Sequence, residues 1–178
     1  MKIRTLGGLV AAALLALPVA AHAQSANRHA ARPWGGLALG VETGDLDGFQ
    51  LRGDLEYPVQ RMAPQLVFAF VGSLNWSHLS EHSVDLDELG FTPTARFLFE
   101  ATPTIDLYGD LGLGLYYANL DWDTGDDSDV GLMMKLGVGV GFEVSPTVRL
   151  GGELGFRPHF GDYDDTTTSL LFTALFRL

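Results

Sequence analysis

The stretch Val130-Gly-Leu-Met-Met-Lys-Leu-Gly-Val-Gly-Val-Gly-Phe142 alternates between two kinds of residue. Counting from Val130, every second residue is large and apolar, whereas the positions between them hold glycines, Met133 and Lys135. An alternation with a period of two predicts a β-strand whose two faces meet different surroundings. At about 3.3 Å per residue the strand would be about 43 Å long, which suits a tilted strand that crosses a bilayer.

The same two-faced pattern recurs along the rest of the chain. We expect strands over the segments 34–41, 49–57, 65–77, 89–100, 105–118, 130–142, 148–160 and 168–178. Pro93 cannot donate a ladder hydrogen bond, so we expect a local irregularity in the fourth strand. The pattern as a whole predicts an all-β protein.

The connections between these strands fall into two classes that alternate along the chain. The segments 57–64, 101–104 and 144–147 contain proline, whereas 42–48, 78–88, 121–129 and 161–166 are rich in Asp, Gly and Ser. An up-and-down meander produces this alternation when tight turns occupy one rim and loops occupy the other. We therefore predict an eight-stranded antiparallel up-and-down β-barrel with both termini on the tight-turn rim.

Alternation alone leaves open which face of the barrel is outside. A soluble, lipocalin-like barrel would turn the apolar face inward. The polar face, however, is rich in Gly and Ala, as a narrow lumen requires, and Lys135 is the only lysine after Lys2. Aromatic residues also collect near both ends of the apolar face, as in the interfacial girdles of membrane barrels. These residues are Tyr57, Phe99, Phe142 and Phe176 at the tight-turn end, and Phe49, Trp76, Phe91 and Tyr117 at the loop end. We therefore predict a transmembrane β-barrel.

The N-terminal residues have the pattern of an export signal. Lys2 and Arg4 precede an apolar run over 9–21, and Ala21-His22-Ala23 fits a signal-peptide cleavage site. We predict a signal peptide over 1–23, a short periplasmic tail over 24–33 and an outer-membrane barrel over 34–178. No other apolar run is long enough for a transmembrane helix, and the absence of cysteine excludes disulfides and thiolate metal sites.

With these features the chain resembles the small eight-stranded outer-membrane β-barrel proteins of the opacity-protein, OmpX and OmpA-barrel type. The resemblance rests on the signal peptide, the eight alternating strands, the Leu111-Gly-Leu-Gly-Leu115 repeat and the apolar C-terminal strand. One difference is that such barrels usually end in an aromatic residue, whereas this chain ends in Leu178 after Phe176. The resemblance implies a Gram-negative outer-membrane protein whose partners are membrane lipid, lipopolysaccharide and the assembly machinery.

Charged residues of both signs are predicted to face the lumen. The acids are Asp54, Glu56, Glu100, Asp106, Asp110, Glu143 and Glu153, and the bases are Arg52, Arg96, Lys135, Arg149, Arg157 and Arg177. Charges removed from water need partners, and an eight-stranded barrel is just wide enough for its side chains to fill. We therefore expect a closed, salt-bridged lumen, with a narrow channel for small solutes or ions as an alternative.

The other fifteen acids are predicted to lie in the loops, without any Lys or Arg. They are Glu42, Asp45, Asp47, Glu81, Asp85, Asp87, Glu88, Asp121, Asp123, Asp126, Asp127, Asp129, Asp162, Asp164 and Asp165. The dense segment 121–129 lacks the EF-hand pattern, but Asp121, Asp123, Asp126, Asp127 and Asp129 are candidates for weak Ca²⁺ or Mg²⁺ binding. A cationic or host-surface ligand is a second hypothesis, and solvation of the loops is the simplest one.

Catalysis is a further alternative. His78-Leu-Ser-Glu-His82 could supply metal ligands, but we expect it to lie in a loop, where its spacing carries little meaning. Lipid A deacylases are similar small barrels that use a His-x-Ser pair in a late strand, and here no serine follows His159 by two positions. We therefore predict a structural or surface-interaction protein rather than a lipid-modifying enzyme, with no cofactor and no nucleic-acid partner.

Overall fold

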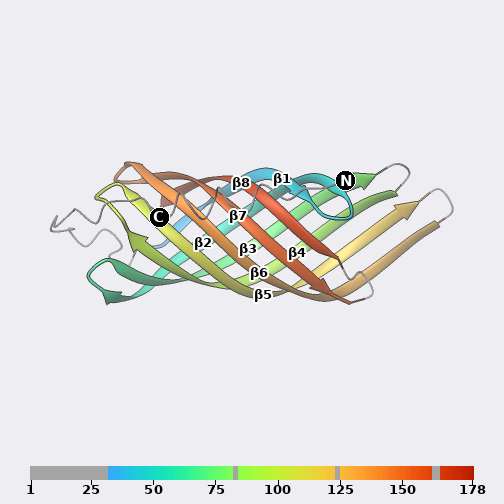
Figure 1. The fold of residues 1–178 in the computed structure, drawn as a ribbon, viewed down its shortest axis with the longest axis horizontal. Helices are drawn as coiled ribbons and strands as arrows, with labels where there is room; N and C mark the ends of the chain where they lie inside the picture. Colours follow the sequence, from blue (N-terminus) through green and yellow to red (C-terminus); the bar gives the residue numbers. More distant parts are fainter. Residues whose placement is uncertain (1–31, 82–83, 123–124, 162–164) are drawn as a thin grey trace, which may run out of the picture.

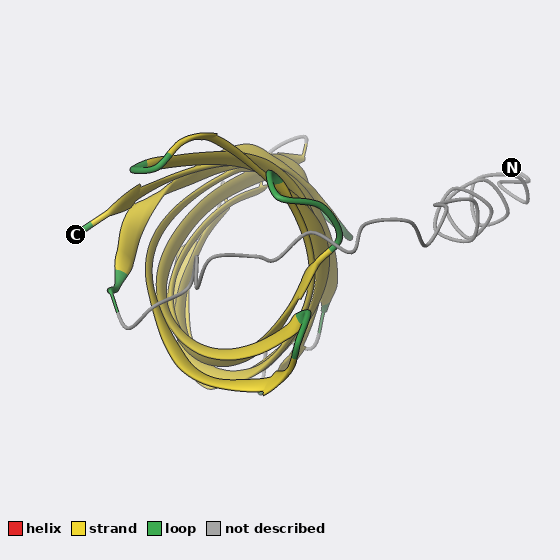
Figure 2. Ribbon diagram, turned by 90° about the vertical axis from the view of Figure 1, so that its left-hand side faces the viewer, coloured by secondary structure: helices red, strands yellow, loops and turns green. Residues whose placement is uncertain are grey.

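Eight antiparallel strands form one closed ring in the computed structural model, which describes residues 32–81, 84–122, 125–161 and 165–178 (Figure 2). The strands are β1 (Trp34–Thr43), β2 (Asp47–Ala63), β3 (Leu66–Glu81), β4 (Val84–Glu100), β5 (Ile105–Trp122), β6 (Gly125–Ser145), β7 (Val148–Phe160) and β8 (Thr166–Arg177). Each strand pairs with its neighbours in sequence, so the predicted up-and-down barrel is confirmed. The predicted signal peptide and most of the tail lie outside the described residues.

The ladder between β1 and β8 closes the ring. It runs from the pair Trp34 and Arg177 to the pair Thr43 and Thr168, and the Leu178 N–H donates to the Pro33 carbonyl at 2.9 Å. Both ends of the barrel chain therefore lie on the tight-turn rim, as predicted. A closed ring leaves no sheet edge open, and a backbone in lipid requires this because no water can satisfy it there.

The opposite rim, here called the hairpin rim, differs from the prediction. β3 continues to Glu81 and β4 starts at Val84, and β5 and β6 extend likewise to Trp122 and from Gly125. These two long hairpins project beyond the rest of the ring (Figure 1). The loops predicted over 78–88 and 121–129 are therefore mostly strand, and residues 82–83 and 123–124 lie outside the described residues.

The sequence pattern did not indicate the long hairpins because the apolar residues change faces along these strands. Within the barrel wall apolar side chains point outward, but near the hairpin rim Leu79 and Leu86 are fully buried inside the ring, with Leu120 partly buried beside them. They form an apolar cluster with Tyr116, Ala118 and Met133. Water replaces lipid outside at this height, so the apolar residues turn inward as they do in a soluble barrel.

The other differences are local. β2 extends to Ala63 through register shifts after Pro58 and after Arg61, so the predicted connection over 57–64 shrinks to a turn. In β4, Pro93 pairs with Gly72 of β3, whereas the ladder to β5 has no pair for Thr92 or Pro93. The predicted irregularity is thus confirmed.

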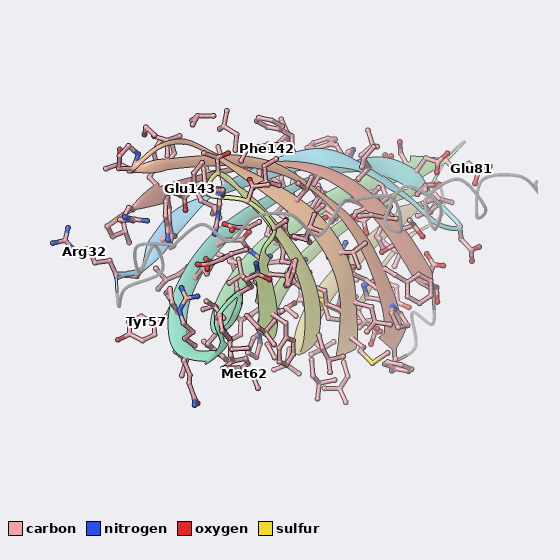
Figure 3. The ribbon with its side chains drawn as sticks, turned by 60° about the vertical axis from the view of Figure 1, so that its left-hand side comes forward. Arg32, Tyr57, Met62, Glu81, Phe142 and Glu143 are labelled. Atoms are coloured by element: carbon pink, nitrogen blue, oxygen red, sulfur yellow. The ribbon has the colours of Figure 1, made fainter. Side chains whose placement is uncertain are left out.

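The predicted apolar face is the outer surface of the barrel. Leu113 and Leu115 in β5 are 59% and 57% exposed, and the predicted girdle residues are exposed as well. Figure 3 shows Tyr57 and Phe142 on the outside of the ribbon. No helix in the described part of the chain is long and apolar enough to cross a membrane. A continuous exposed apolar belt of this kind requires a lipid environment.

Substituting Leu113 by Arg tests this assignment. Leu113→Arg places a charge at mid-height on the lipid face, so we expect it to lower the free energy of unfolding by about 2–4 kcal/mol in phospholipid vesicles. Val144→Arg is the matched control, because Val144 is equally exposed but lies at the tight-turn rim. There we expect a cost of about 0–1 kcal/mol. Equal costs at both positions in urea titrations would contradict a membrane-spanning belt.

Candidate functional site

The middle of the lumen is occupied by a network of ion pairs centred on Arg96 of β4. The Arg96 guanidinium donates from Nε and Nη2 to the two Asp110 carboxylate oxygens, each at 2.7 Å. Its Nη1 donates to Glu56 Oε2 of β2 at 2.9 Å, and its Nη2 lies 3.2 Å from Glu153 Oε2 of β7. One fully buried guanidinium therefore links β4 to carboxylates on three other strands, the neighbouring β5 and the more distant β2 and β7.

Glu153 is the acidic counterpart of Arg96. Its carboxylate accepts hydrogen bonds from Arg52 Nη1 and Nη2 at 2.6 and 2.8 Å, and Lys135 Nζ lies 2.9 Å from its Oε1. The Tyr108 hydroxyl donates to it at 3.3 Å, and the Tyr108 ring packs under the Arg96 guanidinium, 4.0 Å from its Cζ. The bonds from Arg52 of β2 and Tyr108 of β5 cross the lumen, whereas Lys135 lies on β6, the strand next to Glu153.

A second ionic layer lies nearer the hairpin rim. The Arg157 guanidinium bonds Glu42 of β1, and its Nη1 lies 3.2 Å from Glu88 Oε1 of β4. His159 Nε2 lies 2.9 Å from the other Glu88 oxygen. The prediction that Glu42 and Glu88 are loop acids without basic partners is therefore wrong. Both are buried in the lumen because β1 continues to Thr43 and β4 already starts at Val84, so both strands extend past the predicted bounds.

The tight-turn end of the lumen is closed by an aromatic and ionic layer. Trp34 is fully buried, and the guanidinium carbons of Arg149 and Arg177 lie 5.0 and 4.5 Å from its ring centroid. Arg149 Nη2 also donates to Glu56 at 2.6 Å. Arg61, which was predicted to lie in a turn, makes a two-pronged bond with Glu100, with both distances at 2.8 Å.

Most of the predicted lumenal charges are buried where expected. The exceptions are Glu143 and Arg177, which are partly exposed. Among the described residues, eight carboxylates but only five Lys or Arg are buried, so the buried charge is more acidic than the seven acids and six bases predicted for the lumen. Two of these carboxylates have partners outside this set of five, because His159 lies beside Glu88 and the partly exposed Arg61 beside Glu100.

Glycines make room for these large side chains. A Cβ atom on Gly139 would overlap the Tyr108 ring, and one on Gly112 would lie 2.6 Å from Thr94 Oγ1. The crowding explains why the polar face of β5 and β6 is rich in glycine. It also means that the lumen is filled by side chains at the height of Arg96 and Tyr108.

The predicted metal candidates do not converge in the described part of the chain. Asp121 points outward, whereas Asp129 lies on the inner face and accepts a hydrogen bond from the Tyr116 hydroxyl at 2.6 Å. Asp123 and the Asp126 side chain lie outside what the structure describes. Within the described residues no group of three or more His, Asp or Glu is arranged to hold a metal ion.

The outer faces of the two long hairpins carry ordered rows of polar residues. One row across β3 to β6 consists of His78, Asp87, Asn119 and Ser128, and Phe49 of β2 pairs with His78 at the edge of this row. The next row toward the hairpin tips consists of Asp47, Ser80, Asp85 and Asp121. Directly opposite aspartates repel one another, so the acidic character predicted for this rim is retained on strands rather than loops. His78 Nδ1 lies 3.0 Å from Asp87 Oδ1, a contact that the loop interpretation of 78–88 could not reveal.

Comparisons with known proteins agree with this architecture. The family described as outer membrane protein beta-barrel domain matches residues 9–176. The chain is similar to the crystal structure of Neisserial surface protein A, with a TM-score of 0.64, 16% identity and coverage of 82% of this chain and 96% of that one. No curated protein matches the sequence.

Two further solved structures have the same fold. The attachment invasion locus protein Ail of Yersinia pestis gives a TM-score of 0.55 at 19% identity, covering 83% of this chain and 97% of that one. A second Ail structure contains the heparin analogue sucrose octasulfate. The outer membrane enzyme PagL gives 0.55 at 14% identity, covering 82% and 99%. At these identities the likeness establishes the fold alone.

Replacing Glu153 by Gln tests the central network. Glu153→Gln keeps the shape but leaves Arg52, Arg96 and Lys135 short of one buried negative charge, so we expect a loss of about 3–5 kcal/mol in unfolding free energy. The matched control is Asp121→Asn, an exposed carboxylate directly opposite Asp85 in the β4–β5 ladder. It should change stability by about 0.5 kcal/mol or less, toward greater stability. Similar losses in both variants would contradict the network's role.

Proposed function

The chain belongs to the outer membrane protein β-barrel domain family, and on that basis we propose that it is a closed, non-conducting barrel that acts through its outer surface and hairpin rim. It is an integral protein of the outer membrane. Its role is structural, or lies in contacts with molecules outside the membrane, rather than in passage of solutes through the lumen.

The proposal rests on the ion pairs that cross the lumen. Arg52 of β2 reaches Glu153 of β7, and Arg96 of β4 reaches Glu56 of β2. The side chains of both ion pairs are almost completely buried. Opening a path at this height requires that several buried ion pairs separate together, and each separation leaves an unpaired buried charge. The narrow-channel alternative is therefore disfavoured.

The charge of the hairpin rim favours one class of external ligand. Asp47, Asp85 and Asp121 are exposed on its outer face. A field of this sign attracts cationic groups and repels sulfated or phosphorylated polymers. The heparin analogue seen with Ail is a polyanion, so a ligand of that chemistry does not suit this rim. We propose a cationic protein surface as the partner, with binding that weakens as salt concentration rises.

Conductance measurements test the closed lumen. The refolded wild-type barrel in planar bilayers should give no stable open state, because its central charges hold the interior shut. The double variant Arg96→Ala with Glu153→Ala removes both central residues of the ion-pair network and should give frequent openings. Asp121→Asn changes the rim but not the lumen, so it should stay closed. Steady porin-sized conductance of the wild type would overturn the proposal.

Weak divalent binding at the hairpin tips remains a separate proposal. Ca²⁺ or Mg²⁺ bound by rim carboxylates would reduce their mutual repulsion and could bridge them to lipopolysaccharide phosphates. Millimolar Ca²⁺ should then raise the unfolding temperature and slow proteolysis of the hairpins in wild type. It should do neither in Asp123→Asn/Asp126→Asn/Asp127→Asn. Identical behaviour with and without Ca²⁺ would leave solvation as the only role of these acids.

A further inference from the structure

The outer face of the β3–β4 hairpin carries a histidine and an aspartate that the closed lumen does not use. His78 and Asp87 are direct cross-strand partners, and their side chains are 38% and 52% exposed. Asp87 Oδ1 lies 3.0 Å from His78 Nδ1. A carboxylate at Nδ1 selects the tautomer in which Nδ1 carries the proton, so the Nε2 lone pair is left as a base.

Ser80 follows His78 by two residues in β3 and therefore lies on the same outward face. The two Cα atoms are about 6.6 Å apart at the usual rise per residue, and both side chains project from this face. Ser80 is exposed. A hydroxyl, a base and a carboxylate that orients the base are the three parts of a serine nucleophile site.

The site lies at the boundary between the apolar belt and the polar hairpins. The row below His78 and Asp87 is apolar and consists of Leu51, Trp76, Leu89, Tyr117 and Val130. The His78 ring also packs 5.8 Å from Phe49 and 6.5 Å from Trp76, centroid to centroid. Exposed Trp and Tyr mark the headgroup level of the bilayer, which is where the ester groups of membrane lipids lie.

We propose that Ser80, His78 and Asp87 form a hydrolase site for an ester-linked acyl chain of an outer-leaflet lipid. Ser80 Oγ attacks the ester carbonyl carbon while His78 Nε2 takes the hydroxyl proton. The tetrahedral intermediate expels the alkoxide, which His78 protonates to the free alcohol, and an acyl-serine remains. Water then attacks the acyl carbon, gives its proton to His78 and releases the fatty acid, and the proton returns to Ser80. Asp87 acts as a positioning residue for the imidazole.

The charges next to Ser80 limit the class of ester that the site would accept. Its cross-strand neighbours on the outer face are Asp47 of β2 and Asp85 of β4. Two carboxylates beside the nucleophile disfavour a phosphate at the scissile bond and favour an uncharged ester, linked to a sugar or to glycerol. They also repel the carboxylate product once it forms, which assists its release.

The experiment uses the full chain refolded in vesicles. One set of vesicles contains lipopolysaccharide and the other contains phosphatidylethanolamine, so the arms separate sugar-linked from glycerol-linked acyl chains. Released fatty acid is measured by mass spectrometry. We expect release in at least one arm, and a loss of about a hundredfold or more in Ser80→Ala and His78→Asn. Ser128→Ala is the matched control, an exposed serine of the polar row that includes His78 and Asp87. It should retain full activity.

Asp87 requires a different readout because it acts through His78. Asp87→Asn should lower kcat with little change in KM, and Asp87→Glu should restore part of kcat. A lipophilic fluorophosphonate should label Ser80 in wild type and in Ser128→Ala but not in His78→Asn. Heat-modifiable migration on gels verifies that each variant is folded.

Two outcomes would overturn the proposal. One is a folded wild type that releases no fatty acid in either arm and takes no label. The other is release that persists unchanged in Ser80→Ala. Conductance of the same vesicles tests the closed lumen separately, so a failed hydrolase assay and a failed closed-barrel model remain distinguishable.

Discussion

Ring closure in eight strands is the constraint on which the rest of this protein depends. The β1–β8 ladder satisfies the last open backbone edge, and a lipid-exposed backbone could be satisfied in no other way by strands. A ring of eight leaves an interior only as wide as its own side chains. Every inward residue must therefore fit against the side chains around it, which makes glycine and large side chains complementary there, as Gly139 and Tyr108 illustrate.

The interior is filled by layers of side chains, alternately apolar and ionic. An apolar cluster that includes Leu98 and Tyr108 lies on the tight-turn side of Arg96, and the cluster of Leu79 and Leu86 lies on the hairpin side. Between the clusters, Arg96 and Glu153 pair with each other and each has further charged partners, so no single pair stands alone. A buried ion pair by itself adds little stability because desolvation offsets its attraction. A network in which each charge has several partners instead makes the removal of any one member costly.

The outer surface is under a different constraint, because it faces lipid along the barrel wall and water at the hairpins. Lipid demands apolar side chains, and water above it demands polar ones, so the alternation changes phase between Leu89 and Leu86 in β4. The same change brings His78, Ser80 and Asp87 onto the outer face directly above the apolar belt. The barrel wall thus provides a rigid frame, and these three polar side chains lie where the outer face changes from apolar to polar.

The sequence by itself determined the strand number, the meander and the outward apolar face, because period-two alternation and alternating turn classes are local patterns. It also identified most lumenal charges, since parity within a strand sets which face a residue occupies. Tertiary structure decided the partners: Glu42 with Arg157 and His78 with Asp87 depend on register and on strands that extend past the membrane. Local patterns could not reveal them, because phase reversal makes a strand resemble a loop and pairing across the ring leaves no trace in sequence spacing.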